Sequence, residues 1–194
     1  YQIRKNKLFI VQNPINVKSI RKNIKPYRTE GNSLKVIFVG RLTYQKGLDR
    51  VMKIFSCLKN IEFVIVGAGK EYKNLIEICN KNNLQEKINF VGFMNNPFNL
   101  VAGADYFLLP SRWEGMPNCV LESLALGTPV IAFNEIGALK DFDLNIKNKS
   151  ITLTKNNVTL VKVLSNLKPR SDYLKPKLRK SLLHKPISEK GYAK

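Results

Sequence analysis

The segment Ala104–Phe133, ADYFLLPSRWEGMPNCVLESLALGTPVIAF, decides the fold class of this 194-residue chain. It contains two short runs, ADYFLLP and TPVIAF, with the length and composition of buried strands. Between them, residues 117–126 place apolar side chains at three- and four-residue intervals, which predicts a short helix that stops at Gly127. A strand, a helix and a second strand in this order predict two parallel strands joined by a helical crossover.

The same alternation extends on both sides of this unit. Further β-branched or aromatic runs predict buried parallel strands, and segments with helical spacing lie between them. The repeated pattern predicts an α/β fold with a doubly wound, Rossmann-like parallel sheet. The expected strands outside the unit are residues 35–40, 61–67, 88–92 and 150–154. The expected helices are residues 47–58, 71–80 and 157–167, with a short turn near residues 97–102.

The basic charge of the chain is concentrated at its two ends. With 33 Lys and Arg against 14 Asp and Glu, the formal net charge is +19. Residues 1–30 hold 8 basic side chains and 1 acidic one, and residues 168–194 hold 9 and 2. We therefore expect a domain over residues 31–167, preceded by a basic segment or interdomain linker and followed by a basic tail. Such ends suit an anionic membrane surface or a polyphosphate, and a solvated lysine-rich tail is the alternative.

The composition disfavours several classes of protein. The chain has no uncharged apolar run of membrane-spanning length and no secretory signal pattern, so we expect a cytoplasmic protein, free or peripheral on the inner face of the plasma membrane. Its cysteines, Cys57, Cys79 and Cys119, form no metal or redox pair and are expected to be reduced packing residues. The basic ends lack interleaved stacking aromatics, which disfavours nucleic acid as a partner. Because residue 1 is Tyr1 and not Met, we expect a piece of a longer protein.

Ligands of open parallel sheets bind beyond the carboxyl ends of the strands, where this chain places small and polar residues. The helix after Glu114 begins with Pro117, which suits a first helical turn, and Asn118, which can cap it. Backbone N–H groups of residues 116–119, together with the helix dipole, would form an anion site. Glu122 could bind a ribose diol, and Glu114 could face a sugar hydroxyl or a developing positive charge. The alternative is a pair of glutamates without a role.

Two cations follow the first expected strand. Gly40 allows close approach, Arg41 projects from the end of the strand, and Lys46 begins the next helix. We expect both side chains to face the anion site, and ordinary surface solvation is the alternative. The fragment GAGKE at residues 67–71 resembles part of a dinucleotide-binding fingerprint, but it lacks the third glycine and follows the second strand instead of the first.

Five segments in order along the chain, FVGRLTYQKGLD, FVIVGAGKE, INFVGF, ADYFLLPSRWEGMPNCVLESLALGTPVIA and NEIG, resemble family 4 glycosyltransferases, which are group 1 enzymes of the retaining GT-B class. The resemblance covers residues 12–137, and its most specific element is the pair Glu114 and Glu122 within EGMPNCVLE. It implies one half of a GT-B fold, the C-terminal half that binds a nucleotide-sugar donor. The implied reaction moves a hexosyl group, expected to come from a UDP-sugar, to a cell-envelope glycan or lipid acceptor. Without the N-terminal acceptor domain or a separate subunit that completes the site, we expect weak donor binding and little or no transfer.

The resemblance also implies roles for individual positions. Arg41 and Lys46 match the cations that hold the donor diphosphate, Glu122 matches the ribose contact, and Glu114 matches the carboxylate at the donor sugar. The catalytic residues would be Arg41, Lys46 and Glu114. The implied donor-binding set has residues 92–94 beside the base and residues 115–118 at the sugar and phosphates, and comprises Gly40, Arg41, Lys46, Gly92, Phe93, Met94, Glu114, Gly115, Met116, Pro117, Asn118 and Glu122.

No cofactor or metal is expected. Cleavage of the bond between sugar and diphosphate develops negative charge on the leaving phosphate, which two cations and a helix entrance can stabilise. The Asp-x-Asp sequence of residues 141–143 lies in a polar loop, and a magnesium ion there would need the diphosphate beside it. The lone histidine, His184, lies in the basic tail and is expected to be a surface residue.

The chain departs from the family pattern in the loop after the strand VIAF. Ile136 stands where the family has a second glycine, and Lys140, beside Asp141, stands where it has a glutamate. Two other interpretations are open: a GT-B-like sugar-nucleotide epimerase or phosphorylase, and a non-catalytic basic module that holds an anionic partner through its ends. The sequence context of the two glutamates favours transfer over both.

Overall fold

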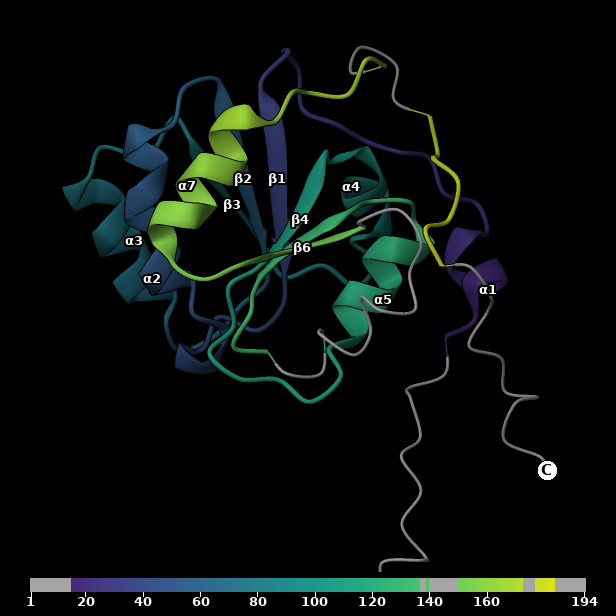
Figure 1. Ribbon diagram of the computed structural model, residues 1–194, viewed down its shortest axis with the longest axis horizontal. Coiled ribbons are helices and arrows are strands. Elements are labelled where there is room, and N and C mark those ends of the chain that lie inside the picture. The colour runs from purple at the N-terminus through teal and green to yellow at the C-terminus, as the bar shows by residue number, and fades with distance from the viewer. Residues whose placement is uncertain (1–14, 137–138, 140–149, 173–176, 184–194) are drawn as a thin grey trace, which may run out of the picture.

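The computed structural model describes residues 15–136, 139, 150–172 and 177–183. Six parallel strands form one sheet in the order β3-β2-β1-β4-β5-β6, with helices on both of its faces (Figure 1). This is the strand order of a Rossmann-type sheet. The strands are added on one side of β1 up to β3 and on its other side from β4 onward, so the order switches between β1 and β4. The predicted α/β class and doubly wound parallel sheet are confirmed. The strands are β1 (Leu34–Val39), β2 (Ile61–Val66), β3 (Ile88–Gly92), β4 (Tyr106–Leu109), β5 (Val130–Phe133) and β6 (Ile151–Thr154).

Two groups of helices enclose the sheet. One layer holds α2, α3 and α7, and the other holds α4 and α5 with α1 beside α5 (Figure 1). Within the described residues, no helix has the length and apolar character needed to cross a membrane. The helices are α1 (Val17–Arg21), α2 (Leu48–Met52), α3 (Tyr72–Lys81), α4 (Phe98–Gly103), α5 (Asn118–Ala125) and α7 (Asn157–Asn166), with short 3-10 helices η2 (Tyr44–Lys46) and η3 (Lys53–Cys57).

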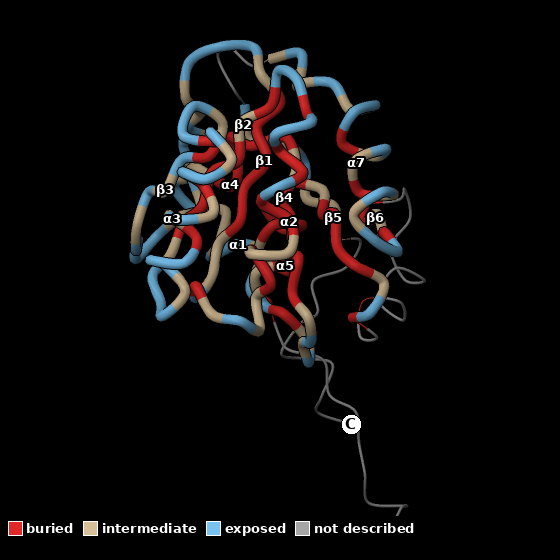
Figure 2. The backbone as a smooth tube through the Cα atoms, turned by 90° about the vertical axis from the view of Figure 1, so that its left-hand side faces the viewer, coloured by how far each residue is buried: buried red, intermediate tan, exposed pale blue. Residues whose placement is uncertain are grey.

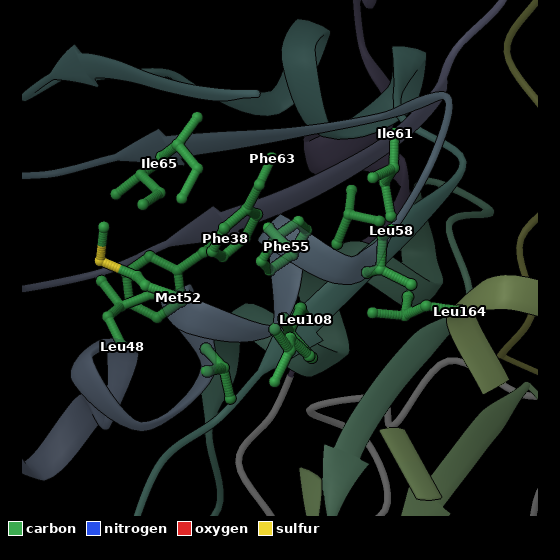
Figure 3. Close-up of a cluster of buried hydrophobic side chains, with 14 of the residues drawn as sticks. Phe38, Leu48, Met52, Phe55, Leu58, Ile61, Phe63, Ile65, Leu108 and Leu164 are labelled. Atoms are coloured by element: carbon green, nitrogen blue, oxygen red, sulfur yellow. The ribbon is translucent and has the colours of Figure 1, made fainter. Parts of the chain in front are cut away.

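The central strands are apolar throughout because each helical layer covers one side of the sheet. Along β1, Val36 and Phe38 enter the layer of α2, α3 and α7, whereas Ile37 enters the layer of α4 and α5. In the first layer, the rings of Phe55 and Phe63 stack with centroids 4.6 Å apart (Figure 3). Figure 2 shows burial concentrated along the strands and exposure concentrated in the loops. The loops at the strand ends are therefore the parts of the domain that are free to bind a ligand.

The helix expected over residues 47–58 is shorter than predicted. α2 ends at Met52, and the chain continues as η3. Ser56 Oγ donates to Lys53 O at 2.7 Å, and a serine that bonds the nearby backbone competes with the α-helical hydrogen-bond pattern. The tighter turn still delivers Phe55 to the core, where it is fully buried.

Parts of the two basic ends are built into the domain. Arg21 of α1 donates from Nη1 to Ala125 O at 2.7 Å and from Nη2 to Arg179 O at 2.8 Å. Leu182 N donates to Leu124 O at 2.9 Å, so the chain after α7 returns to the end of α5. A cation is favoured at the carboxyl end of a helix, where carbonyl groups lack partners. Part of the terminal positive charge is thus used inside the fold and not presented to solvent.

A buried carboxylate joins three distant segments. Asp105, just before β4, is 2% exposed. Its Oδ2 accepts from Arg28 Nη1 at 2.9 Å and from Lys35 N at 2.7 Å, and its Oδ1 accepts from Arg170 N at 2.8 Å. Asp105 therefore holds the segment before β1, the start of β1 and the segment after α7 at one point.

Candidate functional site

A cavity of about 210 Å³ opens at the carboxyl ends of β1, β2 and β3, where a parallel sheet of this kind binds ligands. Gly67 has φ +146°, and a Cβ atom there would lie 1.9 Å from Gly40 O, so glycine is required for this close approach of the two strand ends. The cavity brings together predicted site residues from distant parts of the chain. It is lined by Val39, Gly40, Arg41, Val66, Gly67, Ala68, Phe93 and Met94.

Arg41 presents an uncommitted positive charge at this cavity. It is exposed, and none of the hydrogen bonds or ion pairs among the described residues involves its guanidinium. Gly92, with φ +84°, ends β3 and is followed by Phe93 and Met94, whose side chains are 73% and 36% exposed. A guanidinium binds phosphate oxygens and also stacks on flat rings. The surroundings therefore suit a ligand that combines an anionic part with a flat, partly apolar part.

Lys46 is committed to a partner that the sequence pattern did not indicate. Its Nζ lies 2.6 Å from Glu114 Oε1, and the two side chains are 13% and 9% exposed. Ser111 Oγ, from a fully buried residue, donates to the same oxygen at 2.7 Å. Lys46 ends η2 and does not begin a helix, because Gly47 takes a left-handed conformation immediately after it. The prediction that Lys46 begins the next helix is therefore wrong, and the structure pairs two residues expected to contact different parts of a donor.

Arg112 clamps together the two loops that carry this ion pair. Its Nη1 and Nη2 donate to the two carboxylate oxygens of Asp49 at 2.8 and 2.6 Å, and Nη1 also donates to Tyr44 O at 2.6 Å. Arg112 N donates to Gln45 O at 2.8 Å. The hydrogen bond from Arg112 lowers the pKa of Asp49 below its usual value, although burial opposes this shift. The sequence pattern does not indicate this clamp, because no local spacing links Arg112 to Asp49.

Two exposed aromatic side chains lie over the clamp. The rings of Tyr44 and Trp113 have centroids 6.2 Å apart, and the guanidinium carbon of Arg112 lies 3.7 Å from the centre of the Tyr44 ring. Tyr44 is 58% exposed and Trp113 is 55% exposed. With this exposure, Trp113 does not cover the core. Met116, by contrast, is half-buried and packs against the core layer of α4 and α5.

The start of α5 differs in detail from the prediction. Pro117 occupies the N-cap position with φ −75° and ψ 111°, and Asn118 is the first helical residue, so the prediction of Asn118 as the cap is wrong. Pro117 has no side-chain acceptor, and the helix start has no side-chain capping bond from it. Gly127 has φ +82°, as expected for the left-handed stop after α5. A Cβ atom on Gly115 would meet nothing within 4 Å, so open space adjoins the backbone just before the helix.

Glu122 is half-buried in the second turn of α5. Burial raises the pKa of its carboxyl group. With Asn118 and Leu121 it lines a second cavity of about 150 Å³, whose other wall consists of Ile15, Asn16 and Ile20. The segment of α1, which was predicted to be only a basic end or linker, therefore contributes to the surroundings of Glu122.

The pKa of Cys119 is affected by the charged residues near the start of α5. Burial raises the pKa of its thiol to about 12, Lys46 opposes the shift, and both Glu114 and Glu122 add to it. Three charged side chains from two loops and one helix thus act on a single thiol. The neutral thiol packs against the core layer of α4 and α5, which supports the packing interpretation of this cysteine.

Several predicted features lie outside the described residues, namely Gly137, Lys140, Asp141–Asp143 and His184. Ile136, which stands where the family pattern has a glycine, is 1% exposed and packs in the core. In the part of the chain that the structure describes, no three His, Cys, Asp or Glu side chains gather in a way that could hold a metal ion.

Comparison with known proteins relates this arrangement to one family. The family described as Glycosyl transferases group 1 matches residues 19–168. The O-antigen biosynthesis glycosyltransferase WclY of Escherichia coli is 35% identical over 136 residues, which are 70% of this chain and 38% of WclY. A Campylobacter jejuni protein, N-acetylgalactosamine-N,N'-diacetylbacillosaminyl-diphospho-undecaprenol 4-alpha-N-acetylgalactosaminyltransferase, is 31% identical over 135 residues, covering 68% of this chain and 36% of that protein. The chain thus spans about a third of the length of these curated relatives.

The fold is also shared with solved structures. Anabaena Alr3699/HepE, solved in complex with UDP, matches with a TM-score of 0.61 and 21% identity, over 69% of this chain and 38% of that chain. At this identity the likeness concerns the fold, which is that of one half of a GT-B glycosyltransferase. The family match runs from α1 to beyond the end of α7 and includes every loop of the candidate site. On this evidence the chain belongs to the glycosyl transferases group 1 family.

Proposed function

We propose that this chain is the C-terminal, donor-binding half of a retaining glycosyltransferase, and that it takes a hexosyl group from a UDP-sugar. One observation carries the proposal: an uncommitted arginine, a paired lysine and two glutamates gather at the carboxyl ends of the parallel strands. These are the charges that a sugar linked to a diphosphate requires, with cations for the phosphates and carboxylates for hydroxyl groups.

In the proposed complex, the nucleoside occupies the cavity at the ends of β1, β2 and β3. Exposed Phe93 and Met94 offer apolar contact to the base, and Gly92 turns the chain beside it. Glu122 would accept hydrogen bonds from the ribose hydroxyls. Its raised pKa means that burial already disfavours the charged carboxylate, and two hydroxyl donors would compensate for that cost.

The diphosphate would lie between Arg41 and the start of α5. Arg41 is available because no described residue neutralises it. The first turn of a helix presents backbone N–H groups and a positive dipole end to an anion, and the open space at Gly115 leaves room for phosphate oxygens and for the sugar. Met116, Pro117 and Asn118 form the rest of this entrance.

The proposed chemistry follows from these charges. As the bond between the anomeric carbon and the diphosphate breaks, its electron pair stays on the phosphate oxygen, where Arg41 and Lys46 stabilise the growing negative charge. Glu114 faces the positive charge that develops at the anomeric carbon. The acceptor hydroxyl would attack from the face that the leaving group vacates. Its oxygen bonds to the anomeric carbon while its proton passes to the departing phosphate oxygen, and attack from this face retains the configuration. Two cations and a helix entrance supply the charge needed, so the proposal includes no metal.

The acceptor is proposed to be a cell-envelope glycan or lipid. Support comes from the relatives, since one is named for O-antigen biosynthesis and the name of another includes a glycan on diphospho-undecaprenol. An N-terminal acceptor domain or a separate subunit would complete the site. The proposed location is the cytoplasm, and the exposed Lys18, Lys22 and Lys25 around α1 would face the anionic inner surface of the plasma membrane.

The two alternative functions are less well supported. Part of the charge that a basic module would use at the ends of the chain is committed, because Arg21, Arg28 and Arg170 donate to groups inside the domain, whereas Lys18, Lys22 and Lys25 are exposed. A sugar-nucleotide epimerase or phosphorylase could share this architecture. It would convert the nucleotide sugar without an acceptor glycan, and product analysis in the absence of an acceptor would reveal that activity.

Titration calorimetry of the full chain with UDP tests the proposal. We expect saturable binding that Arg41→Ala weakens at least tenfold, because a hydrogen bond between charged groups contributes about 1.5–3 kcal/mol. Lys53→Ala, which removes an exposed cation of η3 away from the site, is the control and should bind UDP like the unmodified chain. Absence of binding up to millimolar UDP, or equal affinity in the Arg41→Ala variant, would refute the donor site.

A further inference from the structure

We infer that the ion pair between Lys46 and Glu114 makes this site discriminate a nucleotide sugar from the free nucleoside diphosphate. The inference rests on the proposed function, because it concerns the same donor site. Lys46, which is proposed to bind the diphosphate, is paired in this structure with Glu114, which is proposed to bind the sugar. Occupation of one subsite therefore depends on occupation of the other.

The geometry of the pair limits how it can open. Glu114 Oε1 accepts from Lys46 Nζ at 2.6 Å and from Ser111 Oγ at 2.7 Å, so Ser111 orients the carboxylate while Lys46 neutralises it. The two loops are fixed to each other by the bidentate bond between Arg112 and Asp49. Movement of the loops cannot easily separate the charges, and the pair must open through rotation of the lysine side chain.

A nucleoside diphosphate without a sugar would meet this pair at a disadvantage. If Lys46 turns to the phosphates, Glu114 keeps only Ser111 and becomes a largely buried charge without a counterion. If Lys46 stays, the diphosphate loses one cation and lies close to a carboxylate. Either arrangement lowers the affinity for the free diphosphate.

A nucleotide sugar removes both disadvantages at once. Sugar hydroxyls can donate to Glu114 in place of Lys46, and the released ammonium can then bind the diphosphate. After transfer the sugar is gone, Lys46 returns to Glu114, and the nucleoside diphosphate leaves more readily. Because solvent still reaches both side chains, which are 13% and 9% exposed, the pair corresponds to a difference of about fivefold in affinity.

Binding of UDP and of UDP-glucose, used as probes, tests the inference in the full chain. We expect Glu114→Gln to bind UDP about fivefold more tightly than the unmodified chain and to bind UDP-glucose no more tightly. The preference for the sugar-bearing probe should therefore fall by at least fivefold. Glu77→Gln, which removes the same charge from an exposed position on α3, should change neither affinity.

The same Glu114→Gln change in a Lys46→Met chain distinguishes release of the Lys46 ammonium from simple repulsion between Glu114 and the diphosphate. In a Lys46→Met chain there is no ammonium to release, so adding Glu114→Gln should give a clearly smaller gain in UDP affinity than it gives when Lys46 is present. An equal gain in both backgrounds, or no gain in the unmodified background, would overturn the inference while leaving the donor site intact. Failure of the unmodified chain and of Glu77→Gln to bind UDP would instead refute the proposed function, and the inference with it.

Discussion

Replacing Asp105 by asparagine tests how the ends of the chain are tied to the sheet. The carboxylate accepts hydrogen bonds on both oxygens, from Arg28 and Lys35 N on Oδ2 and from Arg170 N on Oδ1. Asparagine keeps the shape but turns one of these acceptors into a donor. Whichever way the amide is oriented, an N–H group then faces another N–H group in a buried site.

The expected loss of stability can be estimated from the burial of the pair. The side chains of Arg28 and Asp105 are 1% and 2% exposed. Removing one partner of a buried ion pair costs about 3–5 kcal/mol, because the other charge is left without compensation. For a domain of this size, a loss of about 3 kcal/mol lowers the melting temperature by roughly 6–12 °C.

Urea unfolding followed by circular dichroism measures this change, with Glu77→Gln as the control for loss of an exposed carboxylate. The control should stay within about 0.5 kcal/mol of the unmodified chain. A loss below about 1 kcal/mol for Asp105→Asn, with an unchanged urea dependence, would show that Asp105 is not the joint between these segments.

Three further predictions concern the site. Glu122→Gln should raise the free energy of unfolding near neutral pH, because burial raises the pKa of Glu122 and disfavours its charge in the folded state. Urea unfolding should show that this gain vanishes below the usual carboxyl pKa of 4.5, and the UDP affinity of the variant should fall. Thiol labelling at pH 8 should modify exposed Cys57 quickly and Cys119 very slowly, because the pKa of Cys119 is about 12; fast labelling of Cys119 would contradict its burial. The bond from Arg112 to Asp49 should stabilise the unmodified chain above pH 3.8, and this stability should be lost as the pH falls through the lowered pKa of Asp49. Asp49→Asn should lack this contribution, and equal acid sensitivity of the two chains in unfolding curves across that range would show that the bond contributes nothing.

The positions of the strands follow from local sequence to within a residue or two, because buried parallel strands are continuous apolar runs. Helix ends are less predictable. Pro117 and not Asn118 is the N-cap residue of α5, and α2 is followed by η3. The spacing of apolar residues allows several helix ends, and local hydrogen bonds such as that from Ser56 to Lys53 O determine which one forms. α1 was not predicted, since its five residues gain their stability from packing beside α5 and not from helical propensity.

In the candidate site, too, the sequence predicts some features and not others. Residue type and position at strand ends and at a helix start made Arg41, Lys46, Glu114 and Glu122 candidates, and the resemblance to family 4 glycosyltransferases implied their roles. The ion pair between Lys46 and Glu114 joins residues 68 positions apart, so no local pattern could indicate it.

The sequence by itself determined the fold class, the order of strands and helices along the chain, and the loops in which a ligand could bind, because periodicity, glycine and proline act over a few residues. Only the tertiary structure decided which charges are free and which are paired. It left Arg41 uncommitted, joined Lys46 to Glu114, and placed Arg21 and Arg28 inside the domain. The physical reason is that the partner of a charge depends on distances in space, which the packing of distant segments sets.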